Sequence, residues 1–485
     1  MTEPKQSTSS SPLSTELDKL LSKEERKHID KYTIGMRRGK ERPGAELPLR
    51  TRLRRMVEGV HRRFWYRLFR TFFNNTEVTA RIPIENVRSI FILPFGDAIG
   101  DMLLAIPLFH AIKRRNPDCR LGTFYSSRNK ALIRCDSAID DLFEFHNKSD
   151  FRHYSELRSV REKHYDVVIN MHMNHMTEFG IISNIISPSG IKVCTSHARN
   201  ELYQTLFNKL LPFDRSSMHL SQFGLSMLES VIDFGTPIEQ WEAHPKIVIS
   251  PEIQEGVGIR IRDELARLDA DWYIHFNPQA RNPTREWGLD NAFAYAQQFV
   301  EHYPRGAIFF TASPAMRGPV EERIKNLKLE RTTFFSTSYD LLELAELSNR
   351  SELVITPDTA GIHFGTASGK PTLVLWPDRE RIPLEWIPLQ VPSINLAPDV
   401  RGALVPTISV ETVWAATKML LDKAWTSTAT SVGLIPEADP LYQASNAHKP
   451  LASLIECSAL PRVFVPGSRH SVPLSSLRGQ KAVVQ

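Results

Sequence analysis

The sequence has few cysteines and no long hydrophobic run. Its four cysteines, Cys119, Cys135, Cys194 and Cys457, stand at unrelated spacings, which argues against a zinc site and against a disulfide framework. No segment approaches the ~18 consecutive apolar residues of a membrane-spanning helix. The polar N-terminus also lacks the apolar stretch of a signal peptide. We therefore expect a reduced, cytoplasmic protein.

The size and composition predict a multidomain globular protein. At 485 residues the chain exceeds one typical domain, and its hydrophobic fraction of 41% is ample for packed cores. The net charge of +5 is modest, so its distribution is more informative than its sum. The first 46 residues are polar, and we expect residues 1–46 to be mobile. Residues 426–485 are rich in Ser, Thr, Ala and Pro, which is typical of a low-complexity tail without a core of its own.

Positive charge is concentrated between Arg50 and Arg70, a stretch that contains eight arginines and one acidic residue, Glu58. Apolar residues recur there at helical spacing. The aromatic residues near its end are Trp65, Phe69, Phe72 and Phe73. The pattern predicts a basic amphipathic helix within residues 47–80 that lies on an anionic membrane surface through residues 49–73. Docking of this helix on its own domain is the main alternative, and we expect no nucleic-acid partner.

From Arg88 onward, short apolar runs alternate with amphipathic helical stretches. This alternation predicts an α/β fold with two Rossmann-like domains facing a cleft, over residues 85–250 and 251–425. The predicted strands are Ser89–Leu93, Arg120–Tyr125, Asp141–Phe145, Asp166–Met171, Ile191–Thr195, Lys246–Ile249, Trp272–Asn277, Ala307–Thr311, Thr333–Phe335, Leu353–Ile355 and Thr372–Trp376. The predicted helices are Met102–Arg115, Tyr154–Lys163, Thr177–Ile186, Glu201–Leu211, His219–Phe234, Glu252–Arg267, Asp290–His302, Ala315–Leu327, Tyr339–Ser348, Ile362–Ser368 and Val410–Ala424.

The clearest strand–turn–helix–strand unit spans Glu352–Pro377, and its turn is Asp358-Thr359-Ala360-Gly361. Small residues let backbone N–H groups approach a ligand closely, and the dipole of the helix that follows favours a phosphate group. An ordinary crossover without a ligand explains the same pattern.

Two aspartates follow the first predicted strand, in Pro94-Phe-Gly-Asp97-Ala-Ile-Gly-Asp101. Either residue could serve only as a helix cap. The functional interpretation is a general base, with its pKa held near the ordinary value by the helix dipole.

Arginines and a histidine supply further candidates. Arg285 lies in the loop after Trp272–Asn277, and its planar guanidinium suits phosphate. Taken by itself, this loop is better explained as a surface loop with solvated arginines. His363 could be a ligand-binding, core or capping residue. Asp269 and Asp271 match an acid–x–acid metal pattern, but they precede a strand, so we expect a loop or cap there and no metal site.

Taken in order, these motifs resemble those of glycosyltransferase family nine, the lipopolysaccharide heptosyltransferases, which have a GT-B fold. The resemblance covers about residues 88–424. The matching motifs are Phe95-Gly-Asp-Ala-Ile-Gly-Asp-Met-Leu-Leu-Ala-Ile-Pro107, Asp166-Val-Val-Ile-Asn-Met-His172, Arg285-Glu-Trp287, and Asp358-Thr-Ala-Gly-Ile-His363 with Gly369-Lys-Pro371. Two departures are Arg285, where the family often has Lys, and Phe364-Gly365, where it usually has Leu-Ala.

The resemblance implies an inverting, metal-independent transfer of a sugar from a nucleoside diphosphate donor, typically ADP-heptose, to a glycolipid acceptor, with no cofactor. Asp101 matches the family's catalytic base, and Asp97 is an additional acid. The residues that would bind or frame the donor diphosphate are Arg285, Trp287, Asp358, Thr359, Ala360, Gly361 and His363. We then expect a peripheral protein on the inner face of the plasma membrane. A nucleotide-sugar epimerase or hydrolase on the same fold, and a catalytically silent membrane-associated binding protein, are the alternatives.

Overall fold

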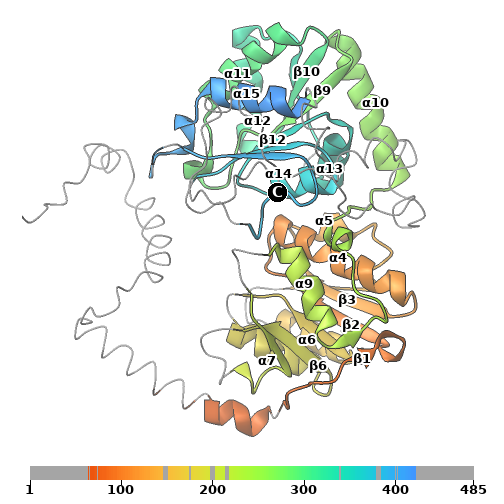
Figure 1. The fold of residues 1–485 in the computed structure, drawn as a ribbon. Helices are drawn as coiled ribbons and strands as arrows, with labels where there is room; N and C mark the ends of the chain where they lie inside the picture. The colour runs from red at the N-terminus through yellow and green to blue at the C-terminus, as the bar shows by residue number, and fades with distance from the viewer. Residues whose placement is uncertain are drawn as a thin grey trace, which may run out of the picture. The chain divides into compact units, whose positions relative to one another are not determined.

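The computed structural model describes residues 60, 64, 66–73, 75–145, 151–173, 176–196, 203–213, 218–337, 340–377, 384–398, 400 and 402–421. The chain divides into two units, Met1–Arg67 and Leu68–Gln485. The second unit contains two six-stranded sheets and the helices that cover them (Figure 1). Among the helices of the described residues, none combines the length and hydrophobicity that a membrane crossing needs.

The first sheet is parallel throughout and has the strand order β4-β3-β2-β5-β6-β7. Its strands are β2 (Ser89–Leu93), β3 (Arg120–Tyr125), β4 (Asp141–Glu144), β5 (Val167–Asn170), β6 (Ile191–Thr195) and β7 (Lys209–Leu211). The associated helices are α4 (Ile99–Arg115), α5 (Lys130–Ile133), α6 (Phe151–Arg161), α7 (Met176–Ile186) and α9 (Leu220–Glu229). A short parallel pair, β1 (Ile82–Pro83) with β8 (Ile232–Asp233), lies beside them.

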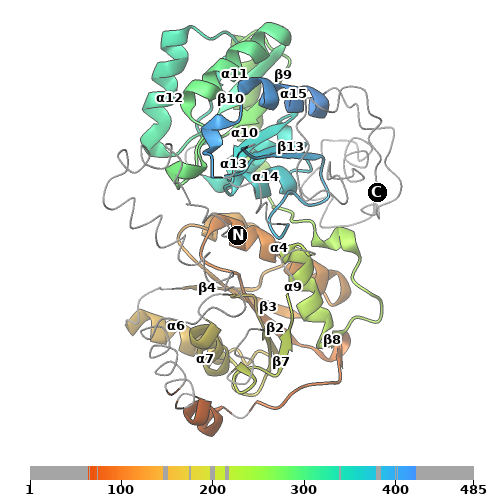
Figure 2. The same cartoon turned by 60° about the vertical axis from the view of Figure 1, so that its left-hand side comes forward.

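Alternate residues of each strand in this sheet face different helices. Ile90 and Ile92 of β2 join the core formed with α4 and α9, which lie side by side in Figures 1 and 2. Phe91 and Leu93 face the other way and pack with residues of α6 and α7. Both faces of a parallel sheet are thus covered, as the near-continuous apolar strands require.

The second sheet has the strand order β11-β10-β9-β12-β13-β14 and is also parallel. Its strands are β9 (Trp272–Phe276), β10 (Gly306–Phe310), β11 (Thr332–Phe334), β12 (Val354–Pro357), β13 (Thr372–Leu375) and β14 (Ser393–Leu396). The helices are α10 (Pro251–Arg267), α11 (Leu289–His302), α12 (Pro314–Leu327), α13 (Leu341–Arg350), α14 (Gly361–Ala367) and α15 (Val410–Leu421). Helices α11 and α15 pack on one face of the sheet, and α10 and α13 on the other.

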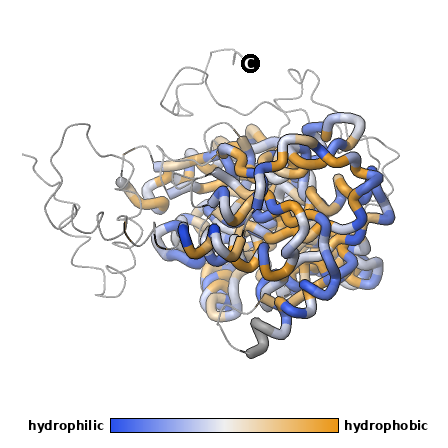
Figure 3. Tube along the Cα trace, turned by 90° about the horizontal axis from the view of Figure 1, so that it is seen from below, coloured by the Kyte–Doolittle hydropathy of each residue, from blue (hydrophilic) through white to orange (hydrophobic). Residues whose placement is uncertain are grey.

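The predicted α/β class is confirmed, and the strands Ser89–Leu93, Arg120–Tyr125 and Ile191–Thr195 have the predicted bounds. Hydrophobic and hydrophilic stretches follow one another along the described part of the trace (Figure 3). Two element predictions are wrong. The last part of the helix predicted over Glu201–Leu211 is strand β7 instead, because Lys209–Leu211 pairs with β6 and completes the sheet. The segment Lys246–Ile249 is not a strand, because Ile247 and Ile249 are buried in the first core and no strand of the described residues pairs with the segment.

Strand β14 was not predicted from the sequence. It follows a proline, Pro392, and its residues are mostly half-buried, so it carries a weak apolar signal. Its pairing with β13 extends the second sheet by one strand.

Most of the predicted basic helix, including residues 47–59, lies outside the described residues, as do residues 1–46 and the tail 426–485. Residues 66–72 are helical, as predicted. In the second unit, Phe69 is 4% exposed and Phe72 is 71% exposed. Burial of Phe69 therefore agrees with docking of this part of the helix on its own domain, whereas Phe72 is exposed to solvent.

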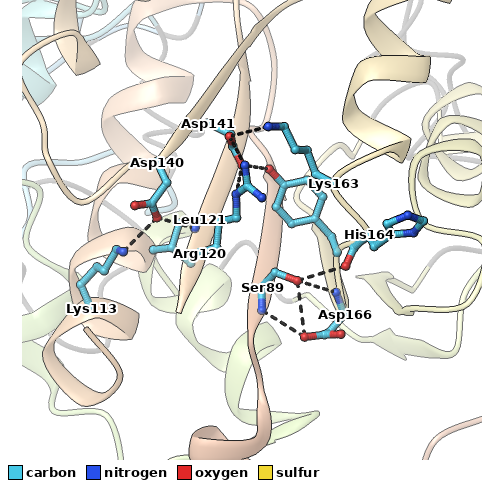
Figure 4. A network of polar contacts seen from close by, with 10 residues as sticks. Ser89, Lys113, Arg120, Leu121, Asp140, Asp141, Lys163, His164 and Asp166 are labelled. Carbon is cyan, nitrogen blue, oxygen red and sulfur yellow. Dashed lines mark hydrogen bonds and ion pairs between the residues drawn. The ribbon is translucent and has the colours of Figure 1, made fainter. Parts of the chain in front are cut away.

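Aspartates at the amino ends of the first sheet stabilise the starts of its strands (Figure 4). The Asp166 carboxylate accepts a hydrogen bond from the Ser89 amide at 3.1 Å, and the Asp140 carboxylate accepts one from the Leu121 amide at 2.7 Å. These acids lie at the opposite end of the strands from the loops that carry Asp97 and Asp101, so we interpret Asp166 as structural.

Candidate functional site

Asp101 lies in the first turn of α4, directly after the loop that leaves β2. Its carboxylate Oδ2 accepts a hydrogen bond from the backbone amide of Ala98, the N-cap residue, at 3.2 Å. A β-carbon on Gly96 would come within 2.4 Å of the same oxygen. The loop therefore requires glycine at position 96 if Asp101 is to keep this orientation.

The pKa of Asp101 is raised to about 6, chiefly because burial removes water from the carboxylate. The Ala98 hydrogen bond lowers this pKa and the negative charge of Asp97 raises it, but both effects are smaller than that of burial. The expectation of a near-ordinary pKa is therefore wrong. A carboxylate that titrates near neutrality is well matched to general-base chemistry.

Asp97 is half exposed and does not duplicate the environment of Asp101. Its carboxylate lies 3.3 Å from Nη1 of Arg128. Its backbone carbonyl accepts a hydrogen bond from the Ser126 hydroxyl at 2.8 Å. Ser126 and Arg128 were not identified from the sequence. The signal that could have found them is position, because they follow the carboxyl end of β3, next to β2.

The turn between β12 and α14 is held by its own side chains. Thr359 Oγ1 lies 2.9 Å from the Thr356 hydroxyl and accepts a hydrogen bond from the Gly361 amide at 3.1 Å. The Gly361 amide is therefore already satisfied. In the described part of the chain, the amides of Thr359 and Ala360 form no hydrogen bond. Of the three amides expected to bind a phosphate, these two remain candidates.

Arg285 and Asp358 come from separate loops and form an ion pair of 3.0 Å. Their strands, β9 and β12, are neighbours, so both loops leave the same edge of the second sheet. Burial raises the pKa of Asp358, whose side chain is 16% exposed, and the positive charge of Arg285 partly offsets this rise. The Arg285 side chain is 34% exposed, so part of it remains in contact with solvent.

Trp287 is fully buried near the loop that carries Arg285. Its indole Nε1 donates a hydrogen bond to the backbone carbonyl of Ile408 at 2.7 Å, and its ring packs near Phe276 and Tyr295. Trp287 thus anchors the one-turn helix η3 (Pro283–Arg285) that carries Arg285.

His363 lies in the first turn of α14, against helix α4. It is 7% exposed, and burial lowers its pKa to about 4, so the imidazole is neutral at physiological pH. A β-carbon on Gly100 would come within 2.8 Å of its Cδ2 atom. The contact places α14 beside the turn of α4 that carries Asp101. Any contact of His363 with a diphosphate would be a neutral hydrogen bond.

The two acids of the acid–x–acid pattern are paired with an arginine. Asp269 and Asp271 both form ion pairs with Arg305, the second at 2.7 Å. Within the described ranges, no group of three or more His, Cys, Asp or Glu side chains is placed to hold a metal ion.

No protein-family model matches the chain. The sequence is 20% identical to lipopolysaccharide heptosyltransferase 3 of Escherichia coli over 298 residues, which cover 57% of this chain and 80% of that protein. The fold is similar to that of a family 9 glycosyl transferase from Veillonella parvula, with a TM-score of 0.56, 20% identity, and coverage of 70% of this chain and 98% of that one. It is also similar to ADP-heptose LPS heptosyltransferase II of Escherichia coli, with a TM-score of 0.52, 14% identity, and coverage of 69% and 99%. These likenesses confirm the GT-B type of fold and the resemblance to family nine.

Proposed function

We propose that this protein is an inverting glycosyltransferase, with Asp101 as its catalytic base. The observation that carries the proposal is the partly buried carboxylate of Asp101, whose pKa of about 6 leaves it ionised but basic at neutral pH. The resemblance of sequence and fold to family nine supports the reaction class. The donor is a nucleoside diphosphate sugar, with ADP-heptose as the first candidate, and the acceptor is a glycolipid of the lipopolysaccharide type.

In the proposed reaction, the Asp101 carboxylate takes the proton of an acceptor hydroxyl. The acceptor oxygen forms a bond to the anomeric carbon from the face opposite the leaving group. The bond between that carbon and the diphosphate oxygen breaks, and its electron pair stays on the phosphate. General-base assistance of this kind contributes about 10²–10⁴-fold to the rate.

Negative charge then develops on the diphosphate. Arg285 and the amides of Thr359 and Ala360 lie on loops at one edge of the second sheet, and they would stabilise that charge as pre-oriented donors. The ion pair with Asp358 fixes the direction of the Arg285 guanidinium, and Trp287 fixes its loop. His363 would add a neutral N–H beside α4, and no metal ion or cofactor takes part in the scheme.

The proposed partner surface is an anionic membrane. In the second unit, the exposed residues that support it are Arg70 and Phe72. Apolar side chains among arginines favour the interface of an anionic bilayer. A glycolipid acceptor is held in such a bilayer. Contact of this segment with the bilayer would therefore raise the rate at which the protein meets its acceptor.

The test is to incubate the purified protein with ADP-heptose and other nucleotide sugars in the presence of lipopolysaccharide-type glycolipid acceptors. Mass spectrometry of the lipid fraction should reveal an acceptor heavier by one sugar, in amounts equal to the nucleoside diphosphate released. A free sugar without a heavier lipid would indicate an epimerase or hydrolase. Donor binding without turnover on any acceptor would indicate a silent binding protein.

A further inference from the structure

We propose that Asp97 and Arg128 act as a paired-charge device that positions Asp101 and sets the pH above which the protein is active. This inference rests on the proposed role of Asp101 as the base. Asp97 lies four residues before Asp101 and is the second acid of this loop. Its ion pair joins the loop after β2 to the loop after β3.

The hydrogen bonds of these two loops position Asp101. Asp97 immediately precedes Ala98, whose amide donates to the Asp101 carboxylate. The Asp97 carbonyl accepts from the Ser126 hydroxyl at 2.8 Å, and its carboxylate pairs with Arg128 at 3.3 Å. The Ser126 amide in turn donates to Asn129 Oδ1 at 2.8 Å. Asn129 is 1% exposed, so the loop that holds Asp97 is itself anchored in the domain.

The electrostatic part follows from the sign of each charge. The negative charge of Asp97 disfavours ionisation of Asp101 and raises its pKa. Arg128 pairs with the Asp97 carboxylate at 3.3 Å and partly neutralises its charge. The titratable group that faces this turn from α14 is His363, and burial keeps it neutral. The Asp97–Arg128 pair is therefore the adjustable charge next to the base.

The expected shifts are modest because the Asp97 and Arg128 side chains are 40% and 49% exposed and solvent screens their charges. In the pH profile of kcat/KM, Asp97→Asn should lower the acidic midpoint by about half a pH unit. Arg128→Gln should raise it by about the same amount, since Asp97 then acts without its partner. The double variant should match Asp97→Asn, and Arg128→Lys should restore the parent midpoint.

The control is Arg158→Gln. Arg158 is an exposed arginine of α6 that forms an ion pair with Glu162, and its replacement should leave the midpoint unchanged. A second readout does not need activity. Asp101→Asn is introduced into the parent, into Asp97→Asn and into Arg128→Gln, and the resulting change in unfolding free energy is measured as a function of pH. The midpoint of this pH dependence should shift in the same directions as the midpoint of kcat/KM.

Equal midpoints in Asp97→Asn, Arg128→Gln and the parent, or shifts of the same sign, would overturn the paired-charge device. Failure of the proposed function is distinguishable from this outcome. If Asp101→Asn keeps full turnover, Asp101 is not the base, while the unfolding measurements still report whether Asp97 and Arg128 control its ionisation.

Discussion

Gly100 of α4 lies against His363 of α14, so closely that a β-carbon at position 100 would come within 2.8 Å of the histidine ring. Phe364 of the same short helix belongs to the core of the first sheet. The two halves of the second unit are thus in direct packing contact beside the helix turn that carries Asp101. The Arg134–Asp340 ion pair of 2.6 Å, between the α5 and α13 regions, is a second contact between them.

Gly100→Ala should destabilise the protein by about 1–3 kcal/mol, the usual cost of forcing an extra methyl group into a packed contact. Chemical denaturation measures this loss. Gly256→Ala is the matched control, because a β-carbon there meets nothing within 4 Å and the site lies inside α10. The control should be neutral or stabilising by up to about 1 kcal/mol. Equal effects of the two changes would contradict the close contact with His363.

The ionisation of Asp101 should also affect stability. Its pKa in the folded state is about 6, above the value of 3.8 for an unperturbed Asp, so folding favours the protonated carboxyl. The stability contributed by this group is present below about pH 4 and is lost as the pH rises through about 6. Asp101→Asn should therefore be more stable than the parent at pH 8, by about 1–2 kcal/mol after solvent screening, and close to it at pH 4. A difference that does not grow between pH 4 and pH 8 would contradict the raised pKa.

Arg285→Ala should weaken binding of a nucleoside diphosphate by about 1.5–3 kcal/mol, the range for a charge-assisted hydrogen bond. Calorimetric titration measures the affinity. The matching nucleoside without phosphates should bind variant and parent alike. Equal losses for both ligands would mean that the loop has been damaged, and the phosphate contact would lose its support.

Much of this fold could be predicted because its strands are short apolar runs between helical stretches. Ser89–Leu93 and Ile191–Thr195 are buried on both faces, so their composition alone identifies them. Lys209–Leu211 could not be recognised in this way. Its strand conformation depends on pairing with β6, and its residues are half-buried, so propensity over the preceding residues favoured a helix.

The sequence predicted which loops carry the candidate residues, but it did not predict the contacts of those residues. Order along the chain placed Asp101, Arg285 and Asp358 after the carboxyl ends of strands, as the structure does. Sequence could not show that Arg285 pairs with Asp358, or that Thr359 satisfies the Gly361 amide. It also could not show that burial, which raises the pKa of Asp101, outweighs the hydrogen bond from the Ala98 amide, which lowers it. These properties depend on three-dimensional packing.

The membrane surface is tested by vesicle binding. Phe72→Ser with Arg70→Gln removes one exposed aromatic ring and one positive charge, and should weaken binding to anionic vesicles by about 10-fold or more, since each basic residue near such a surface contributes about 1 kcal/mol. Binding by the parent should also fall as salt rises. Arg158→Gln, on α6, is the control and should bind as the parent does. A loss of thermal stability with unchanged vesicle binding would instead show that this segment serves only to dock on its own domain.

The measurement that tests the central claim most directly is the turnover of Asp101→Asn, with donor affinity determined on the same preparation. Asparagine keeps the size of the side chain and cannot act as a base. We predict that turnover falls by at least about 10²-fold while the dissociation constant of the nucleoside diphosphate changes little. Near-normal turnover in Asp101→Asn, under conditions where the parent glycosylates its acceptor, would contradict the assignment of Asp101 as the catalytic base.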